Sequence, residues 1–465
     1  MFRGKFGRIH FVGIGGSGMS GIAEVLLNMG FSVSGSDQKE SAVVQRLRKL
    51  GGRVLIGHSA EHIAGVDVVV RSTAIADGNP EIAAAHAAKI PVIPRAEMLA
   101  ELMRLKYGLA VAGTHGKTTT TSMLATCLHK AGLDPTVVIG GRLDAFGSSA
   151  RLGRGDYLVA EADESDGSFL LLHPTVSVIT NIDPEHMEHW RSFDALVDGF
   201  VAFANRVPFY GFTVACLDHP VVQRTLPRLR RRFVTYGLNP QAEVRGTHIR
   251  QEGRTTSFRV WSREVELGEL RVAVPGRHNV ANALAATTVA LELDIPFDRV
   301  QAALEGFTGV DRRFSERADV AGVLVIDDYG HHPVEIRATL AAAAAGYEGR
   351  RIVAVFQPHR YSRVADLADD FCGAFNDAGH VVVCPVYAAG EAPIDGVDHT
   401  RLAQGMTEQG HRSVAVVADL DMAVEHLTRV VRPGDLVITL GAGDVNRVCG
   451  ALAERLRATL GGVGA

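Results

Sequence analysis

Runs of apolar residues alternate with stretches of helical apolar spacing along nearly the whole chain. The first segment has apolar runs at 8–12, 31–35, 66–70 and 91–93, with helically spaced apolar positions over 19–29. The runs predict buried strands, and the spaced positions predict the helices between them. Strands that alternate with helices predict a parallel sheet with right-handed crossover connections.

The same alternation returns in two later segments. The central segment is expected to hold strands at 136–139, 156–160 and 176–180. Residues 212–274 show weaker helical spacing and indicate an antiparallel annex, which precedes a predicted helix over 279–293. The last segment is expected to hold strands at 322–326, 352–356, 381–385, 414–418 and 435–440.

These patterns predict an α/β protein of three domains. Residues 1–105 and 315–465 are expected to be Rossmann-like domains. Residues 106–314 are expected to form a P-loop ATPase-like parallel sheet that carries the small antiparallel annex. The length of 465 residues agrees with this division, because a domain averages about 150 residues.

Composition narrows the class of protein. With 46% hydrophobic and 22% charged residues the chain is too apolar to be disordered, and its net charge of −4 gives no sign of a nucleic-acid-binding surface. The five cysteines are scattered without a C-x-x-C pair, as in reduced cytosolic proteins. No run reaches the roughly 18 apolar residues of a membrane span, and no signal peptide precedes the first strand. We therefore expect a cytoplasmic enzyme.

The most informative stretch lies between an apolar run and a helical pattern. Its residues are Gly113, Thr114, His115, Gly116, Lys117, Thr118 and Thr119. Amides at the start of a helix bind phosphate oxygens, Lys117 would reach the terminal phosphates, and the Thr118 hydroxyl would hold Mg²⁺. The motif is contracted, because Val111 stands where a full P-loop has its first glycine. The spacing favours a nucleoside triphosphate, and the alternative is a glycine turn that caps an ordinary helix.

A second glycine-rich turn, Gly13-Ile-Gly-Gly-Ser-Gly18, follows the first strand, and Asp37 lies about 20 residues further on. Glycines at this spacing predict a pyrophosphate at the start of a helix. Three interpretations stay open: an NAD(P)-dependent oxidoreductase, an enzyme of another nucleotide or sugar-nucleotide diphosphate, and a purely structural turn. The separate triphosphate loop weakens the first, because such an enzyme has less need of a redox cofactor.

Acidic and histidine side chains follow two of the central strands. Glu161 is the first acid beyond the run at 156–160 and is predicted to hold Mg²⁺, with a solvated acidic loop as the alternative. His186 follows the run at 176–180 and is a candidate for a metal or γ-phosphate contact, although a lone histidine is more often structural. The pair His186-x-x-His189 lacks the other features of a zinc site.

Polar residues also mark two further ligand contacts. Asn279 and Asn282 could meet the edge of a purine, and Asn279 could instead be an ordinary helix N-cap. Asp328, Tyr329 and His331 follow a strand of the last segment, and polar loops at 356–363, 386–391 and 441–444 follow others. Such loops at the carboxyl ends of parallel strands predict a binding face.

These motifs, in this order, resemble those of the Mur ligase family, and the resemblance runs nearly end to end. It is carried by His10–Gly21, Gly113–Thr119, Glu161–Asp166, Asn181–Met187, His278-Asn279, Arg312–Phe314, Asp327–Pro333 and Phe356–Tyr361. Each stretch is weak evidence by itself, but the whole series in sequence is specific.

The resemblance implies a function for each domain. The first would bind a UDP-sugar, the second MgATP, and the third the amino acid while closing over ATP. The family reaction would convert the carboxylate of UDP-N-acetylmuramate into an acyl phosphate, from which the amine of L-alanine displaces phosphate. This is the first peptide step of peptidoglycan precursor synthesis. A monomer or weak homodimer with no nucleic-acid or membrane partner is expected.

The resemblance also implies roles for individual residues. The catalytic residues would be Lys117, Glu161, His186, Arg313 and His331, and the metal ligands would be Thr118, Glu161 and His186. ATP would be bound by the loop 113–119 together with Asn279, Asn282, Arg313 and Asp328. The UDP-sugar would be bound by Gly13, Gly15, Gly16, Ser17, Gly18, Met19, Ser20, Asp37, Ser72 and Thr73. The amino acid would be bound by Tyr329, His331 and Arg360.

The distribution of lysines separates branches of the family. Family members that add later residues use a carbamylated lysine of the central domain, and this chain has no lysine after Lys130. That absence fits the alanine-adding branch. The nearest alternative is the branch that attaches a tripeptide to the same sugar, whose motif is typically Asp-Asp-Phe-Ala-His-His where this chain has Asp327-Asp-Tyr-Gly-His-His332. An NAD-dependent oxidoreductase built on the first domain is the alternative from a different class.

Overall fold

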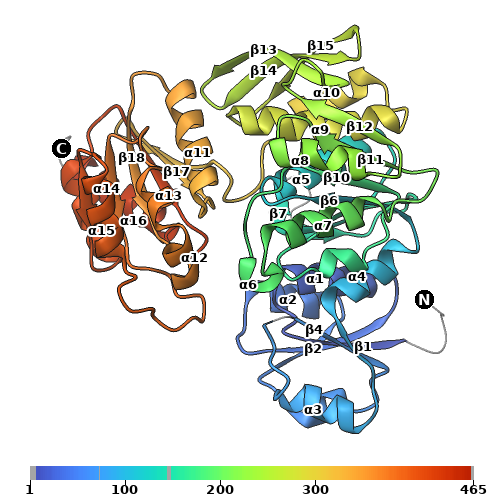
Figure 1. Ribbon diagram of the computed structural model, residues 1–465. Helices are drawn as coiled ribbons and strands as arrows, with labels where there is room; N and C mark the ends of the chain where they lie inside the picture. Colours follow the sequence, from blue (N-terminus) through green and yellow to red (C-terminus); the bar gives the residue numbers. More distant parts are fainter. Residues whose placement is uncertain (1–6, 73, 144–147, 462–465) are drawn as a thin grey trace. The chain divides into compact units, whose positions relative to one another are not determined.

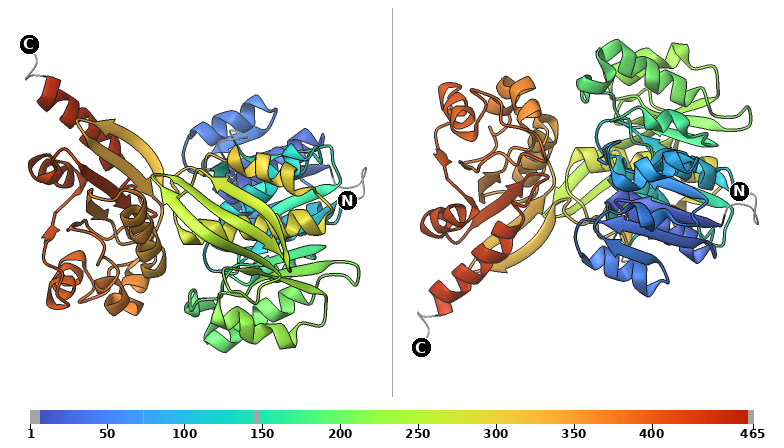
Figure 2. Two further views of the ribbon diagram at one scale, coloured as in Figure 1. Left: turned by 90° about the horizontal axis from the view of Figure 1, so that it is seen from above. Right: turned by 90° about the horizontal axis from the view of Figure 1, so that it is seen from below.

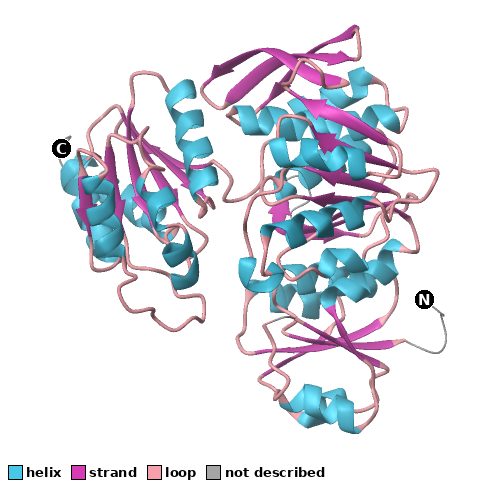
Figure 3. Ribbon diagram, in the orientation of Figure 1, coloured by secondary structure: helices cyan, strands magenta, loops and turns pink. Residues whose placement is uncertain are grey.

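Each segment of alternating strands and helices folds into its own sheet (Figures 1 and 3). The computed structural model describes residues 7–72, 74–143 and 148–461. The chain forms two compact units. The first contains the first sheet and most of the second, and comprises residues up to His248 with Phe258–Arg271 and Ala281–Thr308. The second comprises Ile249–Ser257, Val272–Val280 and the chain from Gly309 onward.

The first sheet is parallel throughout, with strand order β3-β2-β1-β4-β5. Its elements are β1 (Arg8–Val12), α1 (Ser17–Asn28), β2 (Ser32–Asp37), α2 (Ala42–Lys49), β3 (Arg53–Ile56), β4 (Val68–Arg71), α3 (Pro80–Ala87), β5 (Val92–Pro94) and α4 (Arg95–Met103). The strand order reverses at β1, so the glycine turn after β1 lies at the switch point where open α/β sheets bind ligands. The short strand β3 at the edge of the sheet was not predicted.

The second sheet follows the order β15-β14-β13-β12-β11-β10-β6-β9-β7-β8. Its strands are β6 (Tyr107–Ala112), β7 (Thr136–Leu143), β8 (Ser148–Arg151), β9 (Tyr157–Glu161), β10 (Val176–Ile179), β11 (Phe212–Cys216), β12 (Phe233–Gly237), β13 (Val244–Glu252), β14 (Thr255–Ser262) and β15 (Val265–Val272). Its helices are α5 (Lys117–Lys130), α6 (Met187–Trp190), α7 (Phe193–Ala204), α8 (Pro220–Thr225), α9 (Arg277–Glu292) and α10 (Phe297–Glu305).

The antiparallel annex is smaller than the sequence predicts. Strands β11 and β12 pair in parallel with β10 and with each other, so they extend the central sheet instead of starting the annex. Only β13–β15 form the annex, as neighbouring strands joined by two-residue turns, which is the geometry of antiparallel hairpins. The prediction began the annex at residue 212, because the short helix α8 leaves little helical pattern between β11 and β12.

The third sheet has the order β16-β17-β21-β18-β19-β20. Its strands are β16 (Ser315–Val320), β17 (Val323–Asp328), β18 (Arg351–Phe356), β19 (His380–Val383), β20 (Val414–Val416) and β21 (Asp435–Leu440), and its helices are α11 (Pro333–Gly346), α12 (Tyr361–Asp366), α13 (Ala368–Cys372), α14 (His399–Glu408), α15 (Leu420–Val430) and α16 (Arg447–Gly461). One face packs against α11, α13 and α14, and the other against α15 and α16 (Figure 2). The antiparallel strand β16 was not predicted, because its charged residues lack an apolar run.

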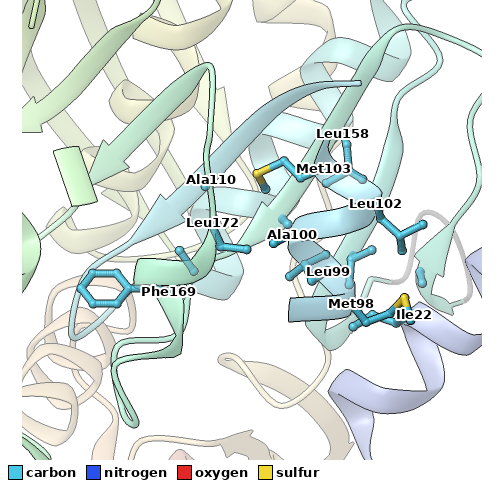
Figure 4. Packing of buried hydrophobic residues seen from close by; sticks show 14 of the residues in the cluster. Ile22, Met98, Leu99, Ala100, Leu102, Met103, Ala110, Leu158, Phe169 and Leu172 are labelled. Atoms are coloured by element: carbon cyan, nitrogen blue, oxygen red, sulfur yellow. The ribbon is translucent and has the colours of Figure 1, made fainter. Parts of the chain in front are cut away.

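A continuous buried cluster joins the first two sheets. It runs from Ile22 of α1 through Met98 and Leu102 of α4 to Leu158 of β9 and Phe169 (Figure 4). One core therefore holds the helix behind the first glycine turn together with the sheet that carries the phosphate loop. None of the described helices is long and apolar enough to cross a membrane.

Phe169 anchors the far end of this cluster and provides a test of it. Phe169 is 1% exposed. The centre of its ring lies 5.3 Å from the centre of the Phe200 ring and 5.0 Å from that of the Phe203 ring. We expect Phe169→Ala to lower the free energy of unfolding by about 3–5 kcal/mol, because the lost contacts leave a cavity. Urea denaturation of both variants measures this, with Phe209→Ala as control, since Phe209 is 85% exposed. Equal losses in the two variants would contradict the assignment.

Candidate active site

The first glycine turn is held in an anion-binding shape by backbone and carboxylate contacts. The Gly13 amide donates to the Ser36 carbonyl at 2.9 Å, and the Gly15 amide donates to Asp37 Oδ2 at 2.8 Å. A Cβ on Gly15 would lie 2.7 Å from that carboxylate oxygen, so a side chain there would displace the Asp37 carboxylate from the turn. Helix α1 begins directly after the turn and has no acidic residue in its first turn. Its amides and dipole therefore favour an anion.

The other predicted UDP-sugar residues fall into different environments. Gly16, Gly18, Met19 and Ser72 line a cavity beside the turn. The Ser20 side chain is buried, and the Asp37 carboxylate contacts the turn itself. Thr73 and the side chain of Ser17 lie outside the described residues.

A buried carboxylate beneath the turn was missed by the sequence analysis. Glu81 of α3 is fully buried, accepts a hydrogen bond from the Ser36 hydroxyl at 2.6 Å and lies 2.6 Å from His62 Nδ1. Burial alone would raise the pKa of Glu81, but hydrogen bonds from Ser36 and His62, together with the His10 ring at 3.6 Å, lower it to about 2. The network fixes the end of β2, whose Ser36 carbonyl receives the Gly13 amide. The sequence feature that could have indicated this network is His10, a histidine within the apolar run at 8–12.

The phosphate loop joins β6 to α5 and depends on two glycines with positive φ. Gly113 has φ +140°, and its Cβ position lies 2.0 Å from Thr180 Oγ1; Gly116 has φ +81° and is the N-cap of α5. Asn181 braces the loop, since its Oδ1 accepts from the His115 amide at 2.7 Å and its Nδ2 donates to the His115 carbonyl at 3.0 Å. The end of β10 thus supports the loop, a role that the sequence analysis did not assign.

Lys117 lies inside the loop and is held by a buried acid. Its Nζ donates to the Gly113 carbonyl at 2.6 Å and lies 2.8 Å from Glu164 Oε2. Burial would lower the pKa of Lys117, but the nearby carboxylates of Glu164, Asp163 and Glu161 raise it above its ordinary value. The lysine is therefore a permanent cation at the start of α5. Its partner Glu164 was not among the predicted site residues, although it belongs to the predicted acidic stretch.

The predicted magnesium ligands differ in their surroundings. Glu161 ends β9 beside Val111 of β6 and lines the same cavity as Lys117. His186 is the N-cap of α6 with φ +58°, and its ring nitrogens lie 3.6 Å from Glu185 and 3.7 Å from Glu188. The described residues contain no group of three or more His, Cys, Asp or Glu side chains that could hold a metal.

The two asparagines of α9, Asn279 and Asn282, are both buried. Helix α9 begins at Arg277, so the alternative that Asn279 is its N-cap is wrong. The side-chain Nδ2 of Asn279 donates to the Pro275 carbonyl at 2.7 Å. Asn282 Oδ1 accepts from the Thr120 hydroxyl at 3.1 Å, and it lies 2.6 Å from the Cβ position of Gly116. Asn282 therefore contacts the phosphate loop directly.

One cavity of about 310 Å³ within the first unit is lined both by the first glycine turn and by Lys117, the first residue of α5 after the second turn. It is lined by Gly16, Gly18, Met19, Ser72, Arg95, Leu99, Lys117, Val138, Ile139, Glu161 and Asp163. Both helix N-termini that favour anions thus contribute to the same space, with a lysine and three charged neighbours around it. This arrangement suits two phosphate-bearing ligands that meet end to end.

In the second unit the loop after β17 is fixed by buried contacts. Asp328 accepts the Phe314 amide at 2.8 Å and the Gly330 amide at 2.7 Å, and burial raises its pKa. The Arg312 and Arg313 guanidinium groups lie 5.0 and 5.2 Å from the centre of the Tyr329 ring, as in cation–π contacts. Asp328, Tyr329 and Arg313 therefore form one cluster.

The residues proposed for the amino acid are divided between two loops. His331 lies 3.5 Å from Glu335, and its ring centre is 5.7 Å from that of His359. Burial first, then the neighbouring His331, lowers the pKa of His359 to about 4. Arg360 is in contact with Glu391 at 4.0 Å. His359 was part of a quoted motif, but it was not among the predicted binding residues.

Comparison with known proteins matches the whole length of the chain. Residues 8–107 match the Mur ligase family catalytic domain, 111–290 the Mur ligase middle domain, and 312–443 the Mur ligase glutamate ligase domain. UDP-N-acetylmuramate–L-alanine ligases from Geobacter sp. strain M21 and Sorangium cellulosum are each 56% identical, the first over 98% of this chain and 99% of its own, the second over 98% of each.

Solved structures show the same fold. The UDP-N-acetylmuramate-alanine ligase of Thermotoga maritima has a TM-score of 0.82 at 31% identity, covering 97% of this chain and 99% of its own. A murein peptide ligase from Psychrobacter arcticus has a TM-score of 0.71 at 24% identity, covering 97% and 98%. The predicted α/β fold class of three domains is therefore confirmed.

The Glu81 network makes a prediction for acid stability. A carboxyl whose pKa falls from 4.5 to about 2 on folding stabilises the native state above the higher value by about 3 kcal/mol. That contribution disappears as the pH falls from about 4.5 to about 2. We expect Glu81→Gln to lose it at pH 7 and to flatten the pH dependence of unfolding by urea over this range. Glu101→Gln is the control, because Glu101 is 37% exposed; parallel curves for wild type and Glu81→Gln would refute the assignment.

Proposed function

The chain belongs to the Mur ligase family, and on that premise we propose that it joins L-alanine to the carboxylate of UDP-N-acetylmuramate at the expense of ATP. This reaction is the first peptide step of peptidoglycan precursor synthesis. The proposal is supported by the relatives named for it, which are as much as 56% identical over nearly the whole chain. The observation that carries it is the cavity that the first glycine turn and Lys117 of the phosphate loop line together.

The proposed reaction has two steps. An oxygen of the sugar-borne carboxylate attacks the γ-phosphorus of ATP, so the bond to the bridging oxygen breaks and ADP leaves. The amine of L-alanine then attacks the acyl carbon, loses a proton, and expels inorganic phosphate from the tetrahedral intermediate. Lys117, a cation at the start of α5, would stabilise negative charge on the transferring phosphoryl group. The Gly15 and Gly13 turn would hold the pyrophosphate of the sugar nucleotide.

The residues near Lys117 are suitable for holding Mg²⁺ together with the phosphates of ATP. Mg²⁺ takes oxygen ligands and is usually held by one or two carboxylates with substrate phosphates and waters, so a site without a cluster of acids is suitable. We propose Thr118 and Glu161 as oxygen ligands and His186 as a further contact. When bound, Mg²⁺ would neutralise charge on the β- and γ-phosphates. Glu161 lines the cavity beside Lys117, which supports this assignment.

The remaining site residues are also proposals. Asn282, which contacts the phosphate loop, and Asn279 would meet the adenine, while Arg313 and Asp328 would complete the ATP site. In the second unit, Tyr329 and His331 with Arg360 would bind the amino acid. We also propose a cytoplasmic monomer or weak homodimer, because ATP and nucleotide sugars are the substrates.

The alternatives are less well supported. The murein peptide ligase of Psychrobacter arcticus shares the fold, but at 24% identity it supports no shared substrate. The Tyr329-Gly330 pair also differs from the Phe-Ala of the tripeptide-adding motif. A nicotinamide-dependent oxidoreductase would have no triphosphate substrate for the phosphate loop to bind.

The function is tested by offering ATP, Mg²⁺ and UDP-N-acetylmuramate with each amino acid in turn. We expect ADP release to be fastest with L-alanine, with partial acceptance of serine or glycine, because small groups differ by only about 1–3 kcal/mol in a small pocket. Coupled ADP detection and mass spectrometry of the product measure this. ADP formed only with a tripeptide, or a nicotinamide bound at the first turn, would overturn the proposal.

Lys117 provides the matched test of the phosphate loop. We expect Lys117→Ala to reduce the turnover number by at least about 100-fold, as removal of a single group that stabilises transition-state charge does. The fold should persist, since Glu164 can take up a proton when its cation is removed. Lys130→Ala is the control, because Lys130 ends the same helix and is exposed. Undiminished turnover in Lys117→Ala, with an unchanged melting temperature, would remove this role.

A further inference from the structure

The cavity between the two turns contains an arginine that the proposed mechanism does not use. Arg95 is the first residue of α4, and it lines the cavity together with Gly16, Gly18 and Ser72. Its side chain is 26% exposed, and its Nη2 lies 3.4 Å from Asp163 Oδ2. The guanidinium therefore lies between the turn that would bind the sugar nucleotide and the acids beside the phosphate loop.

Gly18 shows how closely this guanidinium approaches the start of α1. A Cβ on Gly18 would lie 2.7 Å from Arg95 Nη1 and 3.1 Å from its Cζ. Gly18 lies within the helix, so its backbone conformation does not require glycine. The last glycine of such a turn usually lets a helix pack against its strand. Here its missing side chain also makes room for a cation.

The start of α1 opposes a cation at the position of the Arg95 guanidinium. The N-terminus of α1 carries partial positive charge, and no acidic residue lies in its first turn. Within the described part of the chain, Asp163 is the only carboxylate recorded within 4 Å of Arg95, and 3.4 Å exceeds the usual 2.7–2.9 Å of a charge-assisted hydrogen bond. Asp163 is also shared: burial opposes its ionisation, but the charge of Lys117, then a hydrogen bond from the Ser165 amide, then the charge of Arg95 lower its pKa.

We propose that Arg95 binds an anionic group of the sugar-nucleotide substrate, and that Asp163 holds the guanidinium in place until that group arrives. An anion at the start of α1 is attracted by the helix N-terminus and by Arg95 together. The planar guanidinium can donate two parallel hydrogen bonds to a phosphate or a carboxylate. The inference rests on the proposed function, because UDP-N-acetylmuramate carries both kinds of anion: a pyrophosphate and a lactyl carboxylate.

Calorimetric titration with three ligands tests the proposal. The only anionic groups of UDP are its phosphates. UDP-N-acetylglucosamine adds an uncharged sugar, and UDP-N-acetylmuramate adds the lactyl carboxylate. We expect Arg95→Ala to weaken binding of UDP-N-acetylmuramate about 10- to 100-fold, the effect of losing a charged hydrogen bond. An equal loss for all three ligands identifies the pyrophosphate as the partner of Arg95. A loss confined to UDP-N-acetylmuramate identifies the carboxylate.

A second variant moves binding in the opposite direction. Asp163→Asn keeps the shape of the side chain but removes the competing charge, so we expect it to tighten binding of the ligand that Arg95→Ala weakens. Arg104→Ala is the control for both, because Arg104 follows the other end of α4 and is 62% exposed. In turnover assays, Arg95→Ala should raise the KM for the sugar nucleotide and leave the KM for ATP unchanged.

Three results would overturn the proposal. Arg95→Ala could bind every ligand as tightly as the wild type does. Asp163→Asn could weaken binding as much as Arg95→Ala does, which would show that the Arg95–Asp163 pair only stabilises the local structure. The wild type could bind none of the three ligands, a result that would also refute the proposed function and is therefore distinguishable from failure of the Arg95 assignment alone. Melting temperatures close to that of the wild type establish that each variant is folded.

Discussion

The buried cluster shared by the first two sheets is the constraint on which the proposed chemistry depends. Ile22 lies behind the first glycine turn, and Leu158 lies in the strand next to the phosphate loop, yet both belong to one core. Two helix N-termini about a hundred residues apart in sequence therefore open into one cavity. Attack of a carboxylate on a phosphate requires the reacting atoms to approach within about 3.5 Å. A common core supplies a fixed separation that two independently moving domains would not.

In and around this cavity, the protein's own carboxylates partner the groups that are proposed to receive substrate anions. Asp37 accepts the Gly15 amide, Glu164 pairs with Lys117, and Asp163 lies beside Arg95. Buried cations without partners would be strongly unfavourable, so these acids stabilise the site before substrate binds. Under the proposed function, a substrate anion would replace one of these carboxylates as the partner. The acidic stretch after β9, which would otherwise repel itself, is explained by the cations that its members face.

Most of the fold and the identity of the binding loops could be predicted from the sequence, whereas the partners within the site could not. Apolar runs located the interior strands and glycine spacing located both turns, because these features are local. Strands β3, β8 and β16 were not predicted, since they are edge strands whose sequences lack a long apolar run. The contact between Glu81 and Ser36 joins residues 45 positions apart, and no local pattern encodes it. The pairing of Lys117 with Glu164 depends on which way neighbouring acids face, which spacing does not determine.

The second unit shows a complementary principle, in which a binding loop is held by the ends of several strands. Arg312 donates to the Gly441 carbonyl at 2.7 Å and lies 3.3 Å from Asp327 Oδ2, so it ties the end of β17 to the loop after β21. Its stacking on Tyr329 then fixes that ring before any ligand is present. An acyl phosphate reacts readily with water, so the amine must already be oriented when the intermediate forms. The contacts of Arg312 would meet this requirement for the proposed role of Tyr329 in binding the amino acid, because they hold the Tyr329 loop within the second unit.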